Sequence, residues 1–169
     1  MEKVAHFEKV SLSQFKKDLL KLNPSFEVQM EDIYSDIILP TRATRGSAGY
    51  DFKAPYDITL NPNEVVTITT GIRVFIKEGW VLAIFPRSGL GFKYRLQLNN
   101  TVGIIDSDYY DSDNEGHILI RLANDSKDNK VVSIKKGEGF VQGIFLPFGI
   151  VDDDNVISKR NGGFGSTNS

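Results

Sequence analysis

The 169-residue chain has no cysteine, which excludes disulfides, thiolate metal ligands and a cysteine nucleophile. It has only two histidines, His6 and His117, and they lie far apart in the sequence. Neither a cluster of histidine metal ligands nor a Ser-His-Asp triad is therefore expected. We expect His117 to lie in a strand and to have a structural role.

The chain also lacks a strong excess of charge of either sign. Its 20 Lys and Arg residues face 22 Asp and Glu residues, for a net charge of −2, so no general affinity for nucleic acid or an anionic membrane is expected. No apolar run approaches the ~18 residues of a membrane span, and MEKVAHFEKV at the N-terminus lacks the apolar core of a signal peptide. Together with the missing cysteines, this predicts one globular cytoplasmic domain. An anionic ligand would need local positive contacts.

Residues 11–22 have the apolar spacing of one helical face. The apolar positions are Leu12, Phe15, Leu19 and Leu22. Ser11 is a suitable N-cap, and Asn23-Pro24 is a stop signal. We expect this helix to pack on the main domain, with binding of a partner in a groove as the alternative.

From residue 26 onward, short β-rich runs separated by turn signals predict an all-β sandwich or barrel, such as a jelly roll. The expected strands cover residues 58–60, 64–70, 72–76, 80–85, 101–105, 117–123, 131–134 and 140–147. The polar, glycine-rich end of the chain suits a mobile arm that closes over a ligand. We therefore divide the chain into an N-terminal extension (1–25), a β core (26–151) and a C-terminal arm (152–169).

The usual phosphate-binding patterns, GxxxxGK[ST] and GxGxxG, are absent. Two other segments have suitable chemistry. Asp51 in AGYDF (48–52) can hold a metal directly or through water, or can simply be a turn residue. In PRSGLG (86–91), Arg87, Ser88 and backbone amides after an apolar strand can bind phosphate oxygens, or can form an ordinary turn.

Two further segments place polar groups among apolar neighbours. Asp106, after an apolar pair in NNTVGIIDSDY (99–109), can orient and deprotonate water, or can cap a turn at the end of a strand. Gln142 in GEGFVQGIFLP (137–147) is a lone polar residue that must find hydrogen bonds, either to a ligand or within the core.

The fifth segment is RNGGFGST (160–167), where glycines alternate with polar and aromatic side chains. Arg160 can contact phosphate with two hydrogen bonds, and Ser166 and Thr167 are further donors. Phe164 stands among glycines and can stack on a nucleobase, an interaction of about 1–3 kcal/mol. The alternative is a disordered tail. Together the five segments describe a nucleoside triphosphate site.

These five segments, in this order, resemble the five motifs of the trimeric dUTPase family, over residues 26–167. The resemblance implies a jelly-roll subunit in a homotrimer with active sites at the interfaces, hydrolysing dUTP to dUMP and pyrophosphate with Mg2+. Asp106 would be the general base that aligns water for in-line attack on the α-phosphorus. Asp51 would hold Mg2+ through coordinated water. Arg87, Ser88 and Gln142 would contact the phosphate chain.

The resemblance also assigns the arm and the nucleoside contacts. Arg160, Ser166 and Thr167 would reach the β- and γ-phosphates, while Phe164, next to Gly165, would stack on uracil.

Specificity would come from the third segment. The turn from Asn100 through Gly103 would read the uracil edge and reject a C5 methyl group. Tyr109 would pack on the deoxyribose and leave no room for a 2′-hydroxyl.

The sequence departs from the family pattern after Tyr110, where residues 111–115 (DSDNE) are an apparent insertion. Its start resembles a calcium loop, but the twelfth position is Leu122 instead of glutamate. We expect a solvated hairpin tip, with a regulatory contact or an extra ion site as alternatives. The family pattern does not account for the N-terminal helix either.

Two other functions are compatible with the sequence. The related deoxycytidine triphosphate deaminase shares the fold and the phosphate-binding Arg-Ser, although the IDSDY run and the intact GGFGS arm favour the triphosphatase. A dUTP-binding regulatory protein with a protein partner is the alternative from another class.

Overall fold

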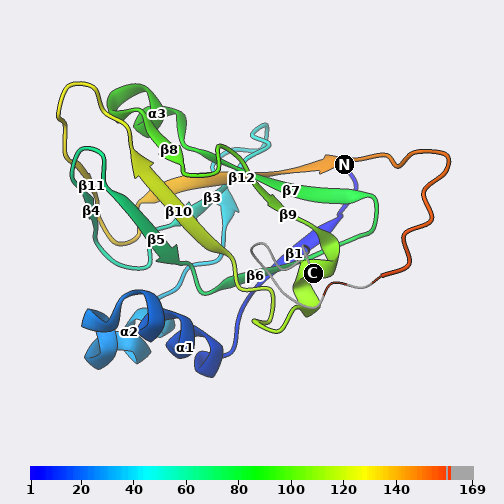
Figure 1. Ribbon diagram of the computed structural model, residues 1–169, viewed down its shortest axis with the longest axis horizontal. Helices are drawn as coiled ribbons and strands as arrows, with labels where there is room; N and C mark the ends of the chain where they lie inside the picture. The colour runs from blue at the N-terminus through cyan, green and yellow to red at the C-terminus, as the bar shows by residue number, and fades with distance from the viewer. Residues whose placement is uncertain (159, 161–169) are drawn as a thin grey trace.

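Short β-strands dominate the computed structural model, which describes residues 1–158 and Arg160 (Figure 1). The strands are β1 (Ala5–Lys9), β2 (Thr41–Arg42), β3 (Tyr50–Lys53), β4 (Ile58–Leu60), β5 (Val65–Thr69), β6 (Ile72–Ile76), β7 (Trp80–Pro86), β8 (Leu96–Leu98), β9 (Gly103–Ile105), β10 (Leu119–Asn124), β11 (Val132–Ile134) and β12 (Gly139–Pro147). The described α-helices are α1 (Leu12–Leu22), α2 (Met30–Ser35) and α3 (Ser88–Tyr94), and the 3-10 helices are η1 (Pro24–Gln29) and η2 (Ser107–Asp111). The predicted all-β jelly-roll class is confirmed.

Alternating side chains give several strands one buried face. In β4, Ile58 and Leu60 are buried and Thr59 between them is exposed. In β10, Leu122 is fully buried next to the exposed Arg121. A single core results, and each large apolar side chain buried in it contributes about 1.5–3 kcal/mol. The largest fully buried side chains include Phe15, Phe52, Phe140, Leu82 and Ile120.

The largest sheet has the strand order β2-β3-β12-β7-β9, with antiparallel neighbours. Asp51 on β3 lies opposite Gln142 on β12, and Gln142 lies opposite Phe85 on β7. On the other side of β7, Leu82 pairs with Ile105 of β9. This sheet therefore carries four of the five candidate segments.

Helix α1 begins and ends where the sequence predicts. The Ser11 side chain accepts a hydrogen bond from the backbone N–H of Gln14, as expected of an N-cap. Phe15 and Leu19 are fully buried. The packed helix is confirmed, so its central apolar stripe is not available to a partner.

The expectation of β structure directly from residue 26 was wrong, because η1 and α2 continue the helical region to Ser35. Strands β2, β3 and β8 were not among the expected strands either, and strand β1 was also missed. Its sequence, AHFEK, has few apolar residues, and it is held by antiparallel pairing with β6, from Ala5 opposite Ile76 to Lys9 opposite Ile72. The N-terminal extension is thus part of the β structure and is not a separate appendage.

The expectation of a solvated tip at residues 111–115 was wrong as well. Ser112 is buried, and the Glu115 carboxylate accepts hydrogen bonds from the backbone and side chain of Ser11. The insertion therefore lies against the start of α1. The sequence cannot show this contact because its partners are 104 residues apart.

After β12, residues 148–158 form an exposed segment without helix or strand that turns back at Asp152 and Asp153, drawn in orange to red in Figure 1. Arg160 then lies beside the turn that follows β9. The mobile arm proposed for 152–169 stays a prediction. Among the described helices, none is long and apolar enough to cross a membrane.

Candidate active site

One group of predicted site residues gathers where β3, β12 and β7 lie side by side. The Nε of Arg87, just after β7, lies 3.3 Å from the Oδ1 of Asp51. The Gln142 amide donates to the carbonyl of Pro86 at 3.4 Å. Asp51 is largely buried, with 15% of its side chain exposed, whereas 43% of the Arg87 side chain remains exposed. The guanidinium is therefore both anchored and open to an anion.

Two glycines allow this group to pack closely. A Cβ at Gly49 would overlap the amide oxygen of Gln142, and a Cβ at Gly139 would lie 2.6 Å from an Nη of Arg87. Both positions belong to motifs that the sequence singled out. Glycine is required at both positions because a side chain lies close to the backbone there, and not because of a special φ angle.

Ser88 opens α3, a seven-residue helix where only a strand end or a turn was expected. Together with Arg87, Gly89 and Gly139 it lines an open cavity of about 460 Å³. Ser88 is exposed, so its hydroxyl is available to a ligand. An arginine, a hydroxyl and the N–H groups of the first helical turn are suited to phosphate oxygens.

The predicted base-reading turn borders a second, smaller cavity. Strand β8 turns back at residues 98–101, where Leu98 and Thr101 form a bridge and the Thr101 N–H donates to the Leu98 carbonyl. Asn100 and Gly103 line a mostly apolar cavity of about 160 Å³ beside this turn. A small apolar cavity with polar groups at its edge suits a flat ring.

Asp106 follows β9 directly and is engaged by the arm. Arg160 donates to Asp106 Oδ2 at 2.5 Å and to Asp108 Oδ1 at 3.0 Å. The Asp106 side chain is 46% exposed, so the carboxylate faces solvent apart from this contact. Asp108 was not predicted to contact Arg160, although the IDSDY run contains this second carboxylate.

Tyr109 lies just beyond Asp106 in η2 and is buried, with 4% exposure. Its hydroxyl donates to the His117 carbonyl at 2.8 Å, and the Arg160 guanidinium lies 5.8 Å from its ring centroid. Burial raises the pKa of Tyr109 despite the hydrogen bond from Asn114, so the phenol stays protonated. The expected structural role of His117 agrees with its full burial, but its expected place in a strand was wrong, because β10 begins only at Leu119.

The two groups lie at opposite ends of β7. Because Leu82 pairs with Ile105, Asp106 lies near Val81, six positions before Arg87. At about 3.3 Å per residue this separation is about 20 Å, more than an arginine and an aspartate side chain span together. The predicted site residues of one chain therefore form two separate groups, called half-sites below, one around Arg87 and one around Asp106.

Phe164, Gly165, Ser166 and Thr167 lie outside the described residues, so only Arg160 represents the fifth segment. In the part of the chain that is described, no group of three or more His, Asp or Glu side chains is arranged to hold a metal ion. Within the group around Arg87, Asp51 offers a single largely buried carboxylate. One protein ligand suits a cation that keeps much of its hydration shell, as Mg2+ does.

Comparison with known proteins adds a family to this geometry. Residues 35–168 match the family model described as dUTPase. The deoxyuridine 5′-triphosphate nucleotidohydrolase of Lactococcus lactis is 43% identical over 145 residues, covering 84% of this chain and 95% of that protein.

Solved structures agree with this match. The dUTPase from Streptococcus mutans superposes with a TM-score of 0.61 at 36% identity, over 70% of this chain and 91% of that one. A mutant dUTPase from phage phi11 of S. aureus, whose structure contains a structural Mg(II) ion, shares the fold, with a TM-score of 0.64 at 19% identity over 92% and 98% of the two chains. On the family model and the identity to the Lactococcus protein, the chain belongs to the dUTPase family.

Proposed function

We propose that this chain is a dUTP diphosphatase, which hydrolyses dUTP to dUMP and pyrophosphate. Membership of the dUTPase family supports dUTP as the substrate. The structural observation that carries the proposal lies in the third segment: Asn100, Gly103 and Ile105 line one cavity, and Asp106 is the next residue after Ile105. A base held in that cavity would bring its own phosphate chain toward this carboxylate.

In the proposed reaction, Asp106 accepts a proton from a water molecule as the water oxygen attacks the α-phosphorus. The bond from the α-phosphorus to the oxygen bridging to the β-phosphorus breaks on the opposite side, and pyrophosphate leaves with that oxygen. Arg87, Ser88 and Gln142 contact the phosphate chain and stabilise the charge that develops on it. Mg2+, bound mainly by the triphosphate and through water by Asp51, would neutralise further charge.

Arg160 occupies one oxygen of the proposed base. It contacts Asp106 Oδ2 at 2.5 Å, so a water molecule that approaches this oxygen has to displace the guanidinium. A triphosphate competes for the same guanidinium, because phosphate oxygens and carboxylates both pair with arginine. Substrate binding would therefore move Arg160 to the β- and γ-phosphates and release Asp106. Phe164, Gly165, Ser166 and Thr167 would follow in the same arm.

The separation of the half-sites supports a homotrimer with shared active sites. The group around Arg87 and the group around Asp106 cannot meet on one α-phosphate within a chain. In a closed ring of three copies, the Arg87 half-site of one subunit faces the Asp106 half-site of the next, because each copy presents both surfaces.

The direct test is release of pyrophosphate from dUTP, dCTP, dTTP and UTP in the presence of Mg2+. We expect dUTP alone to be turned over rapidly and chelation of the metal to stop turnover. Asp106→Asn should lower kcat by roughly 10²–10⁴-fold, as expected of a general base. Asp108→Asn is the matched control, because it removes the neighbouring carboxylate on Arg160 and keeps the base.

Three outcomes contradict the proposal. Turnover that survives in Asp106→Asn removes Asp106 as the base, and ammonia release from dCTP identifies a deaminase. Absence of turnover in a folded wild-type assembly that still binds dUTP points to a regulatory protein.

Shared sites can be tested separately by co-expressing Asp106→Asn with Arg87→Ala. Mixed trimers should recover activity, because some of their sites combine an intact Arg87 with an intact Asp106 from another copy. If co-expression recovers nothing although mixed assemblies form, the sites lie within single chains.

A further inference from the structure

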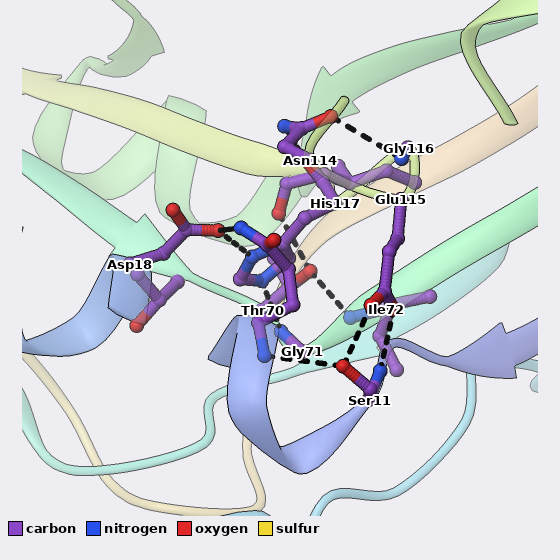
Figure 2. A network of polar contacts seen from close by, with 12 residues as sticks. Ser11, Asp18, Thr70, Gly71, Ile72, Asn114, Glu115, Gly116 and His117 are labelled. Atoms are coloured by element: carbon purple, nitrogen blue, oxygen red, sulfur yellow. Dashed lines mark hydrogen bonds and ion pairs between the residues drawn. The ribbon is translucent and has the colours of Figure 1, made fainter. Parts of the chain in front are cut away.

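The N-terminal segment (residues 1–22, with β1 and α1) is joined to the loop that follows Asp106 by three polar contacts. This loop, residues 107–117, is called the post-β9 loop below. It contains Tyr109 and the insertion. The family model begins at residue 35, so the N-terminal segment lies outside it. Figure 2 shows two of the three contacts, with Ser11 and Asp18 reaching Glu115 and His117.

The first contact is buried. His117 Nε2 accepts a hydrogen bond from the Gly71 backbone N–H at 2.8 Å, so this nitrogen carries no proton. Nδ1 of the neutral ring therefore carries the proton, and it donates to Asp18 Oδ2 on α1 at 2.6 Å. Gln14 donates to the same oxygen at 2.8 Å. His117 is fully buried, and 14% of the Asp18 side chain is exposed. The geometry fixes both the tautomer and the orientation of the ring.

The second contact joins the insertion to the helix cap. Glu115 accepts hydrogen bonds from the Ser11 hydroxyl at 2.6 Å and from the Ser11 backbone N–H at 2.7 Å. These two bonds hold the pKa of Glu115 below its usual range. Glu115 has a positive φ of 58°, a conformation that non-glycine residues keep only where their surroundings enforce it.

The third contact lies at the other end of the loop. The Tyr110 hydroxyl donates to Glu8 of β1 at 2.7 Å. Arg73 of β6 lies 3.6 Å above the Tyr110 ring centroid and donates to the Tyr110 carbonyl at 2.8 Å. The post-β9 loop is thus held on both sides of Tyr109 by the N-terminal segment.

The contacts continue to Tyr109 through the backbone. The Tyr109 hydroxyl donates to the carbonyl of His117, the residue whose ring Asp18 holds. It also accepts a hydrogen bond from Asn114 at 2.8 Å, next to Glu115 in the insertion. Gly116 has a φ of 69°, and a Cβ there would lie 2.7 Å from the Tyr109 carbonyl. Tyr109 therefore cannot shift without movement of residues that the N-terminal segment holds.

We propose that Asp18 and Glu115 are positioning residues that set the place of Tyr109 and, through it, the discrimination between deoxyribose and ribose triphosphates. The inference rests on the proposed function, in which Tyr109 packs on the sugar. Neither residue touches substrate. Asp18 acts through His117, and Glu115 ties the insertion to the N-cap of α1. The N-terminal segment and the insertion, two additions to the family pattern, thereby form one brace behind the sugar contact.

The experiment compares kcat and KM for dUTP and for UTP in Asp18→Ala, Glu115→Ala and the wild type. Glu31→Gln is the matched control, because Glu31 of α2 forms an ion pair with Lys16 of α1 and takes part in none of the three contacts with the post-β9 loop. Asp18→Asn is the conservative variant, since its side-chain oxygen still accepts from His117 Nδ1.

We expect the ratio of kcat/KM for dUTP to that for UTP to fall roughly tenfold in the two alanine variants, because a displacement of about 1 Å in a positioning group costs up to about 10²-fold. Most of the change should come from a gain in UTP turnover. Hydrogen exchange of the amides of residues 107–117 should become faster in the same variants. Asp18→Asn and Glu31→Gln should resemble the wild type.

The outcomes separate this inference from the proposed function. If the wild type does not hydrolyse dUTP, the proposed function fails, and hydrogen exchange then still reports whether the brace orders the loop. If the wild type is active but the alanine variants keep both the dUTP/UTP ratio and the exchange rates, the inference is overturned. A loss of stability with an unchanged ratio also overturns it, because that result describes a purely structural contact.

Discussion

Replacing Asp18 by alanine tests the buried contact on which α1 depends. The substitution leaves the Nδ1–H of the fully buried His117 without an acceptor, and Gln14 loses its partner too. Hydrogen bonds that involve a charged group contribute about 1.5–3 kcal/mol, and an unpaired buried donor costs about 1–3 kcal/mol. We expect Asp18→Ala to lower the free energy of unfolding by about 2–3 kcal/mol at pH 7.

The loss should also depend on pH. Burial acts to raise the pKa of Asp18, but the hydrogen bonds from His117 and Gln14 and the charge of Lys17 outweigh it, so its pKa is lowered. The stabilisation is then fully present above the ordinary aspartate pKa of about 3.9 and is lost as the pH falls toward the folded-state value. The difference between wild type and Asp18→Ala should therefore stay constant from neutral pH to about pH 5 and narrow only below about pH 4.

The assay is urea unfolding followed by the fluorescence of Trp80, the only tryptophan. Protomer concentration is held fixed, because assembly makes the apparent stability depend on concentration. Glu31→Gln serves as the control and should change little, since exposed ion pairs contribute little to stability. The reasoning is refuted if Asp18→Ala unfolds at the same urea concentration as this control at pH 7, or if the difference from wild type grows in acid.

Three further changes test the site and the core. Gly49→Ala places a methyl group against Gln142 and should lower kcat for dUTP roughly tenfold with little change in the unfolding midpoint; an unchanged kcat contradicts the close approach. Arg87→Lys keeps the charge but loses the planar fork, so kcat/KM for dUTP should fall about 10²-fold, and full activity would show that a point charge suffices. Phe140→Ala removes a fully buried ring and should cost about 3–5 kcal/mol in urea unfolding. The same change at Phe92, which is 94% exposed, should cost less than about 0.5 kcal/mol; similar losses at both positions would contradict the assigned core.

The sequence was most informative where local signals decide the structure. The limits of α1 follow from apolar spacing and a cap within one segment, and β4 and β6 lie where residues 58–60 and 72–76 were expected to form strands. Strand β1 was missed because pairing with β6 holds it rather than its own composition. Helix α2 is only six residues long, too short for an apolar period to show clearly.

The site residues could be recognised from their motifs. Which of them lie close together in the fold could not be predicted. The proximity of Asp51 to Gln142 depends on strand register, and that of Asp106 to Arg160 on how the chain returns after β12. The insertion was misread for a related reason. Its carboxylates suggested a solvated tip, and nothing in the local sequence indicated that Glu115 would meet Ser11.

The charges of the two half-sites show how a chain with a net charge of −2 can receive a polyanion. Both arginines expected to contact phosphate are already paired with carboxylates, Arg87 with Asp51 and Arg160 with Asp106 and Asp108. The guanidinium groups are therefore held in place before any ligand binds, with 43% of the Arg87 side chain and 22% of the Arg160 side chain exposed. A triphosphate has to compete with those carboxylates. On the Arg160 side that competition would free Oδ2 of the proposed base, and an anion with too few phosphates to displace Asp106 would leave this oxygen paired with Arg160.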